Sequence, residues 1–317
     1  MEELYLLMTG LSNSVINGKI ILLSIIFEAL PFLVLSVFVS ATLNNFVTER
    51  TIRNILPRHK FFNILPAALL GLLLPVCDCG MVIIVRRLVQ KGVPLYTALA
   101  FMLAAPIVNP VAAAATAFAF KGSSIIVGLR LGTALVVAYT TAWLVSLVFK
   151  GSELKAAGAS TVPAKCCGHE HLAGSNTTLS FSAKLALTLR DAGTEFIEMG
   201  KYLLLGSILS ALAQILLDRE ILTVLGQHRF WSIGIMMLFG FCLSVCSSAD
   251  AFIAASFITS FSPGSLIAFM VFGPMLDLKN FLMLAHAFRE RLVVFLTVVL
   301  IILCFGSALV INLFWGG

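Results

Sequence analysis

A break that carries a thiol interrupts an apolar segment twice in this chain. Residues 74–80 read LPVCDCG, residues 244–249 read SVCSSA, and Cys77 and Cys246 stand 169 positions apart. Proline, glycine and short polar residues interrupt a helix and free backbone groups, which a bilayer tolerates only where the protein satisfies them. Two matched breaks inside apolar sequence therefore predict a duplicated helical bundle embedded in a membrane.

The duplication extends beyond the two breaks. Glu28 corresponds to Glu198 at an offset of 170, and Asn109 corresponds to Asp277 at an offset of 168. Because the offset changes by only two over that stretch, chance similarity is a poor explanation, and a long internal repeat indicates two structural units. The predicted units are a first transmembrane repeat (1–149), a polar linker (150–185) and a second transmembrane repeat (186–317).

The composition agrees with a membrane location. Hydrophobic residues make up 60% of the 317 residues, charged residues 11%, and the mean hydropathy is +1.04. Soluble domains carry about 25% charged residues, so we expect an all-α integral membrane protein with broken helices at the repeat interface. Eight apolar segments, four per repeat, have the length of roughly 20 residues or more that a transmembrane helix needs. They are residues 20–43, 61–85, 94–120, 125–149, 196–217, 230–261, 265–283 and 293–314.

The orientation of the two repeats depends on the broken segments. Four crossings per repeat would make the repeats parallel, whereas a broken segment that enters and leaves on one side would make them inverted; the sequence leaves both open. We expect a multi-pass protein of the cell inner membrane. The termini and the linker 150–185 are expected in the cytoplasm, because the linker thiols and the basic segment 86–91 then face the reducing compartment.

The charge pattern limits the partners and the class of activity. The net charge of +6 comes from basic residues in short loops between apolar segments. Such residues contact lipid head groups, so we expect the lipid bilayer and not nucleic acid as a partner. A homodimer is a further expectation. The sequence has no phosphate-binding loop, nucleotide-binding fold or Ser-His-Asp arrangement, so we do not expect an enzyme.

The breaks carry the residues that suit a substrate site. Cys77 and Cys79 flank a carboxylate, and thiolates prefer soft species such as zinc, copper(I) and trivalent arsenic or antimony. The alternative is that these small thiols only fill tight helix contacts. Asn109 and Asp277 each follow a proline by three residues, where a polar side chain either caps a helix or faces a cavity. The predicted substrate-binding residues are Cys77, Asp78, Cys79, Gly80, Asn109, Cys246, Asp250 and Asp277.

Two further acids and one polar tract are candidates for other roles. A carboxylate inside a membrane is costly and therefore a functional candidate, so Glu28 and Glu198 are predicted coupling groups; for Glu198 the alternative is an ion pair with Lys201. In the linker, a short Cys/His tract is typical of metal capture, against the alternative of a plain polar linker. Its predicted ligands are Cys166, Cys167, His169 and His171, which could bind zinc or copper; no other cofactor is expected.

The first break also carries a family resemblance. Residues 75–94 (PVCDCGMVIIVRRLVQKGVP) and 105–110 (APIVNP) resemble the predicted permeases of the YraQ/YcgR type, within the broader ArsP permease family. The resemblance implies an eight-span inner-membrane permease; one branch exports trivalent organoarsenicals and others are suspected of metal efflux or homeostasis. The chain departs from the family pattern at Met81, where relatives usually keep a proline. The residues that carry over are Cys77, Cys79, Gly80, Pro94, Pro106, Asn109 and Pro110.

These observations favour a secondary exporter of a soft metal or metalloid species, namely a trivalent organoarsenical, zinc or copper. Two alternatives stay open. One is a non-transporting membrane partner in metal homeostasis, to which the linker would recruit a metal carrier. The other is a permease for a small organic anion, bound by the N-termini of the half-helices at the breaks.

Overall fold

The computed structural model describes residues 2–46, 60–70, 77–149, 153–154, 181–216 and 230–315, and these residues are almost entirely helical. The prediction of an all-α membrane protein is confirmed: five of the described helical segments are long and apolar enough to cross a bilayer. In chain order the helices are α1 (Glu2–Phe46), α3 (Lys60–Leu70), α4 (Asp78–Gln90), α5 (Leu95–Ala104), α6 (Pro110–Ala119), α7 (Ser124–Val148), α8 (Phe181–Leu216), α10 (Trp231–Leu243), α11 (Ser247–Ser256), α12 (Pro263–Met275), α13 (Leu278–Ala287) and α14 (Glu290–Trp315).

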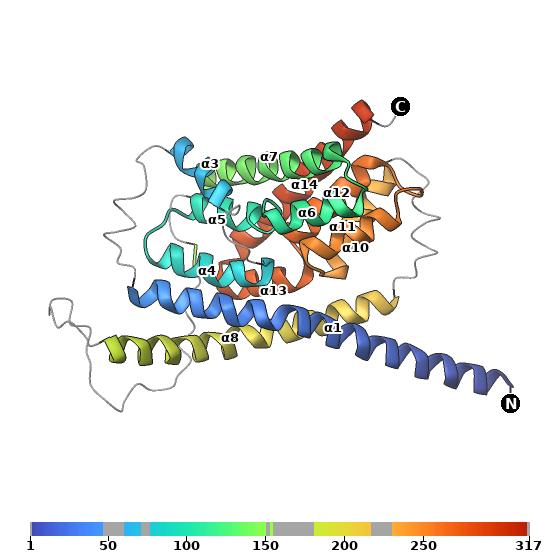
Figure 1. Ribbon diagram of the computed structural model, residues 1–317, viewed down its shortest axis with the longest axis horizontal. Coiled ribbons are helices and arrows are strands. Elements are labelled where there is room, and N and C mark those ends of the chain that lie inside the picture. Colours follow the sequence, from blue (N-terminus) through green and yellow to red (C-terminus); the bar gives the residue numbers. More distant parts are fainter. Residues whose placement is uncertain are drawn as a thin grey trace.

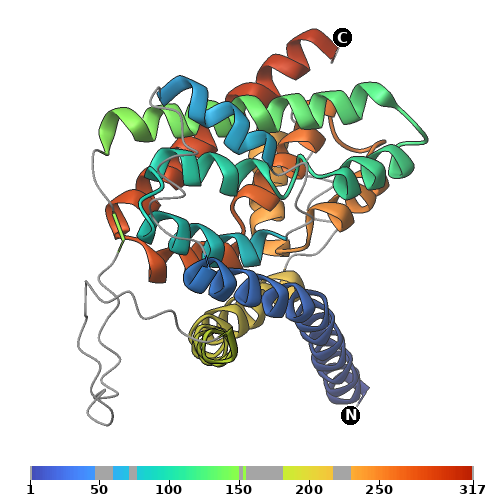
Figure 2. The ribbon, with the colours of Figure 1, turned by 60° about the vertical axis from the view of Figure 1, so that its left-hand side comes forward.

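Two long helices, α1 and α8, form a crossing pair on one side of the molecule (Figure 1 and Figure 2). They run in opposite directions, since α1 begins at the end of the bundle where α8 finishes. Both helices are mainly apolar on their outer faces, and large side chains such as Phe27, 72% exposed, point away from the protein. Such side chains suit contact with lipid tails, which a transmembrane helix needs on its outer face.

The interrupted segments are of two kinds: some turn back inside the bundle, and others continue through it. Figure 1 shows α3 and α4 at one end of the molecule, in different layers, and α10 and α11 at the other end. The chain therefore turns back at each thiol-bearing break, whereas α5 with α6 and α12 with α13 continue from one end to the other. Each half then makes an odd number of complete crossings, which is the inverted arrangement and not the parallel one.

This topology corrects two expectations. The eight apolar segments do not all become spans, because α3 and α4 both lie at one end of the bundle, and α10 and α11 both lie at the other (Figure 1). Both chain termini lie at one end of the bundle, while α7 finishes and α8 begins at the opposite end (Figure 1). The termini and the linker 150–185 are therefore joined to opposite faces of the membrane, and cannot both be cytoplasmic. Hydropathy detects apolar segments but does not record whether a segment reverses.

Four half-helices begin near the middle of the bundle, each at an N-cap with extended backbone. Cys77 (φ −78°, ψ 163°) precedes α4 and Cys246 (φ −74°, ψ 157°) precedes α11. Asn109 precedes α6, and Asp277 precedes α13. The second break is completed by Ser244, whose left-handed backbone (φ 50°, ψ 44°) ends α10. A carbonyl or amide freed at such a break is available to a site inside the membrane.

A close contact between two helices positions α13 against α8. Gly206 on α8 faces the backbone of Lys279, and a Cβ atom at Gly206 would lie only 2.8 Å from Lys279 Cα. We expect Gly206→Ala to push the helices apart and to lower stability by about 1–3 kcal/mol, measured as loss of the monodisperse protein after heating in detergent. The matched control is Gly193→Ala on the same helix, where a Cβ meets nothing within 4 Å. Equal stability of both variants would contradict the close contact.

Candidate functional site

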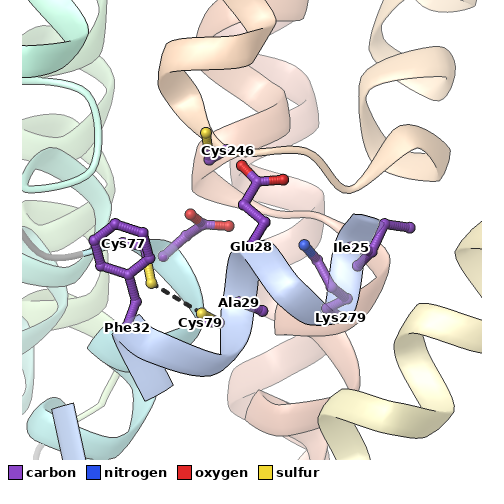
Figure 3. Close-up of a pocket in the computed structure, with 9 residues that line it drawn as sticks. Ile25, Glu28, Ala29, Phe32, Cys77, Cys79, Cys246 and Lys279 are labelled. Carbon is purple, nitrogen blue, oxygen red and sulfur yellow. Dashed lines mark hydrogen bonds between the residues drawn. The ribbon is translucent and has the colours of Figure 1, made fainter. Parts of the chain in front are cut away.

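Two thiols lie side by side at the start of α4. Cys77 is the N-cap and Cys79 belongs to the first turn, and their Sγ atoms are 2.9 Å apart (Figure 3). Cys79 is buried and Cys77 is half-buried. The extended backbone at Cys77 turns its side chain towards that of Cys79, so both sulfur atoms are presented to the same small space. Two adjacent thiols can bond to one soft atom.

The second half contributes a third thiol to this space. Cys246 lies across the pocket from the Cys77/Cys79 pair, beside the carboxylate of Glu28 on α1 (Figure 3). The free space is about 10 Å³, which is enough for roughly one water molecule. The pocket in this structure therefore has no room for a cargo larger than a water molecule. The pocket is lined by Ile25, Glu28, Ala29, Phe32, Cys77, Asp78, Cys79, Cys246 and Lys279.

A buried charged group lies beneath the thiols. Asp78 on α4 and Asp277 before α13 are in hydrogen-bonding contact, and both are at most 5% exposed. Lys279 Nζ lies 3.7 Å from Asp277 Oδ2 and is itself buried. Buried charges persist when they are paired, and the ammonium compensates part of the negative charge of the two acids. This group joins the N-terminus of α4 to that of α13.

The second break has a different environment. Arg130 on α7 is 1% exposed and donates from Nη1 to Thr116 Oγ1 at 2.7 Å and from Nη2 to the backbone oxygen of Ser247 at 2.7 Å. Asp250, in the first turn of α11, is 1% exposed and has an Oδ2 atom without a hydrogen-bond partner. Arg130 is thus the cation that both holds the second break and compensates a buried acid.

Asn109 has a structural role in the geometry seen here. Its Oδ1 accepts from the amide of Ala112 at 2.6 Å, and its Nδ2 donates to Pro106 O at 2.9 Å. The capping alternative therefore accounts for both polar atoms of this side chain. In Asp277 the same cap uses only Oδ1, which accepts from the amide of Asn280 at 2.6 Å. The other oxygen faces Lys279, so Asp277 is both a cap and a member of the buried group.

The eight predicted substrate-binding residues thus separate into two groups. Cys77, Asp78, Cys79 and Cys246 line the pocket. Gly80 follows in the first turn of α4, and Asp277 reaches the pocket through Asp78 and Lys279. Asn109 and Asp250 instead belong to the second break, where Ser247 Oγ donates to Pro106 O.

Glu198 pairs with Arg86 and His286 and not with Lys201, whose side chain is exposed. Its Oε1 accepts from Arg86 Nη1 at 3.3 Å and lies 2.9 Å from His286 Nε2. The alternative of an ion pair at Glu198 therefore applies, but with partners from α4 and α13. The other predicted coupling residue, Glu28, lines the pocket.

The predicted metal ligands of the linker, Cys166, Cys167, His169 and His171, lie outside the described residues. Metal capture by this tract stays a prediction. In the described part of the chain, no group of three or more His, Cys, Asp and Glu side chains is arranged to hold a metal ion.

Sequence reasoning missed that Lys279 and Arg130 are buried cations. They fall within the predicted apolar segments 265–283 and 125–149, yet the basic residues are assigned to the loops between segments, whereas both side chains lie inside the bundle. One signal was available for Lys279, which stands two residues after Asp277 within an otherwise apolar repeat. A lysine beside a buried acid is a candidate ion pair.

A helical membrane bundle whose half-helices begin around a pocket at mid-depth has the architecture of a membrane permease. The chain belongs to the ArsP_1 family of predicted permeases, whose model matches residues 17–313. The UPF0718 protein YcgR of Bacillus subtilis (strain 168) is 42% identical over 299 residues, which cover 94% of this chain and 98% of that protein.

A second relative, from Streptococcus mutans serotype c (strain ATCC 700610 / UA159), is 36% identical over 283 residues, covering 89% of this chain and 91% of that protein. It is described as a putative two-component membrane permease complex subunit. No solved structure matches the chain significantly. The permease class and the YcgR-type family expected from residues 75–110 are thereby confirmed.

Proposed function

We propose that this permease is a secondary exporter of a soft trivalent metalloid species, with a monosubstituted organoarsenical as the best-fitting cargo. The observation that carries the proposal is the 2.9 Å approach of Cys77 Sγ to Cys79 Sγ in a pocket at the centre of the bundle. Packing alone does not require two thiols to face each other beside a carboxylate, whereas a dithiol site does.

The chemistry matches the number of thiols. A trivalent arsenical with one organic group carries two hydroxyl groups that exchange for sulfur. Each thiol forms one As–S bond, its proton joins the departing hydroxide, and two water molecules leave. Release reverses these steps, so no oxidant or reductant is needed. Zinc prefers four ligands, and the described residues offer no cluster of that kind, which favours the metalloid over zinc or copper.

The surrounding residues have defined roles in this proposal. Glu28 lies beside Cys246 and lines the pocket, so it is the candidate group for coupling export to a proton. Glu198 is held by Arg86 and His286 and acts on the helix arrangement. The three aspartates at the half-helix N-termini disfavour the alternative of an organic anion, since they repel negative charge.

A second subunit is part of the proposal. The name of the Streptococcus relative supports the view that this chain works within a complex in the cell inner membrane, in place of or in addition to a homodimer. Transport by purified protein distinguishes a two-subunit exporter from a non-transporting partner. If the chain is part of an exporter, the purified chain, alone or with its partner subunit, must move cargo.

The test is transport by everted membrane vesicles from cells that lack and then regain the gene. We expect uptake of methylarsenite only with the restored gene, with antimonite, zinc and copper as comparison substrates. Uptake of zinc or copper without methylarsenite would replace the proposed cargo. If no substrate moves even with the partner subunit present, the non-transporting alternative holds.

The linker yields a separate prediction. Replacing Cys166 and Cys167 with Ser and His169 and His171 with Ala should lower zinc or copper binding, because thiolate and imidazole are the ligands these ions prefer. Binding is measured by equilibrium dialysis on the purified protein, and size-exclusion chromatography checks that the bundle is intact. An unchanged binding stoichiometry would make residues 150–185 a plain polar linker.

A further inference from the structure

The crossing pair α1/α8 breaks a symmetry that the rest of the bundle keeps. At the offsets of the repeat, α4 corresponds to α11 and α13 to α6, and the structure contains both junctions, α4 with α13 and α6 with α11. Only one is covered: α1 packs on α4 and α8 packs on α13, while contacts of either helix with α6 or α11 are marginal at most in the described chain.

Matched residues show the difference between the two junctions. Lys279 on α13 is 5% exposed, whereas its counterpart Val111 on α6 is 54% exposed. His286 on α13 is half-buried, whereas its counterpart Phe118 is 82% exposed. An apolar hollow of about 570 Å³ lies on this uncovered side, lined by α6 and by Phe252 of α11. The repeat thus supplies a second surface of the kind that α1 and α8 now cover.

We propose that α1 and α8 exchange between these two junctions, so that the uncovered α6/α11 junction takes up α1 and part of α8 in a second state. Inverted repeats with unequal contacts can interchange those contacts, which opens a central site first to one side and then to the other. The inference rests on the chain being a permease, and it does not depend on which cargo is carried.

Side-chain chemistry fits α8 to its present position and α1 to the second one. At the covered junction α8 presents Glu195 and Glu198 to basic side chains of α4 and α13. The counterpart of Glu195 on α1 is Ile25, and the surface of α6, with Val111 and Phe118, is equally apolar. In the second state α1 therefore meets a surface of matching polarity, while Glu195 and Glu198 lose their basic partners.

Ionic contacts between α8, α4 and α13 hold the present state. Arg87 Nε donates to Glu195 Oε1 at 3.2 Å, and Arg86 Nη1 donates to Glu198 Oε1 at 3.3 Å. His286 Nε2 lies 2.9 Å from the same Glu198 oxygen, and its ring stacks on Tyr202 of α8 at 4.2 Å between centroids. We name these contacts the latch. The second state has no equivalent, because Ser256 and Phe118 replace Arg87 and His286 in the repeat.

The test places a photoreactive benzoylphenylalanine at either of two positions and releases the latch. Phe32 lies at the covered junction beside Cys77 (Figure 3), and Phe118 lies at the uncovered one. In the native background we expect position 32 to cross-link to α4 and position 118 to give little cross-link to α1 or α8. With Glu195→Gln/Glu198→Gln, the cross-link from position 118 should rise about tenfold, and that from position 32 should fall.

Two controls make the outcome decisive. Arg86→Gln/Arg87→Gln removes the basic partners of the same latch and should change both cross-links in the same way. If one of the two latch variants folds poorly, the other still tests the proposal. Glu153→Gln removes a carboxylate that pairs with Arg289 and takes no part in the latch contacts, and should change neither cross-link. The proposal is overturned if position 118 stays without cross-links to α1 and α8 in both latch variants, or if Glu153→Gln raises them equally. Cross-linking needs no cargo, so failure of the arsenical proposal would not affect it.

Discussion

Replacing both thiols of the Cys77/Cys79 pair with hydroxyls is expected to abolish export while leaving the fold intact. Serine is nearly isosteric with cysteine, and two hydroxyls can take the place of the contact between the two thiols, so Cys77→Ser/Cys79→Ser should insert and purify like the native protein. A hydroxyl is a poor ligand for a soft atom and keeps its proton on binding, whereas a thiol gives its proton up. Cells that carry the variant should be as sensitive to methylarsenite as cells without the gene.

The control for this variant is another half-buried thiol outside the pocket. Cys242 on α10 is such a residue, and Cys242→Ser should keep full resistance. Direct binding of a phenylarsenical to the purified proteins separates loss of binding from loss of movement. Full efflux of every native substrate by the double variant would show that Cys77 and Cys79 are packing residues and would end the soft-metalloid proposal.

Removing Arg130 should have the largest effect on stability. Arg130→Met leaves Asp250 buried without its cation and removes both hydrogen bonds that join α7 to α6 and α11. An uncompensated buried charge costs about 3–5 kcal/mol, so we expect a strongly lowered yield and a lower midpoint of heat-induced aggregation in detergent.

A compensating change distinguishes charge from packing at this position. Arg130→Met/Asp250→Asn removes the acid together with the cation, and should recover a large part of the lost stability because no buried charge is left alone. If the double variant is no more stable than Arg130→Met, the two hydrogen bonds and not the charge of Asp250 account for the loss. Native stability of Arg130→Met itself would show that the guanidinium is not required.

The sequence predicted which residues of the two breaks lie close together better than it predicted the path of the chain. The break at Cys77 and its counterpart at Cys246 were recognisable because proline, glycine and serine are unusual inside apolar runs, and both residues line one pocket. The direction of α4 was not predictable, since the same apolar residues suit a crossing helix and a hairpin. The burial of Lys279 and Arg130 was missed for a related reason: a charged residue is assigned to a loop even within an apolar segment, although a buried partner can hold it inside.

Four half-helix N-termini meet near the pocket, at Cys77, Asn109, Cys246 and Asp277. Each contributes about half of a positive elementary charge, so together they amount to about two. Lys279 and Arg130 add two more, and the ionised members of the four nearby acids, Glu28, Asp78, Asp250 and Asp277, offset part of this positive charge. An uncharged cargo such as an arsenical that has exchanged its hydroxyls for thiols leaves this electrical balance unchanged. A divalent ion would have to displace an equal positive charge, such as protons, when it enters the site. Its transport rate would then depend on the membrane voltage, whereas transport of the neutral species would be independent of that voltage.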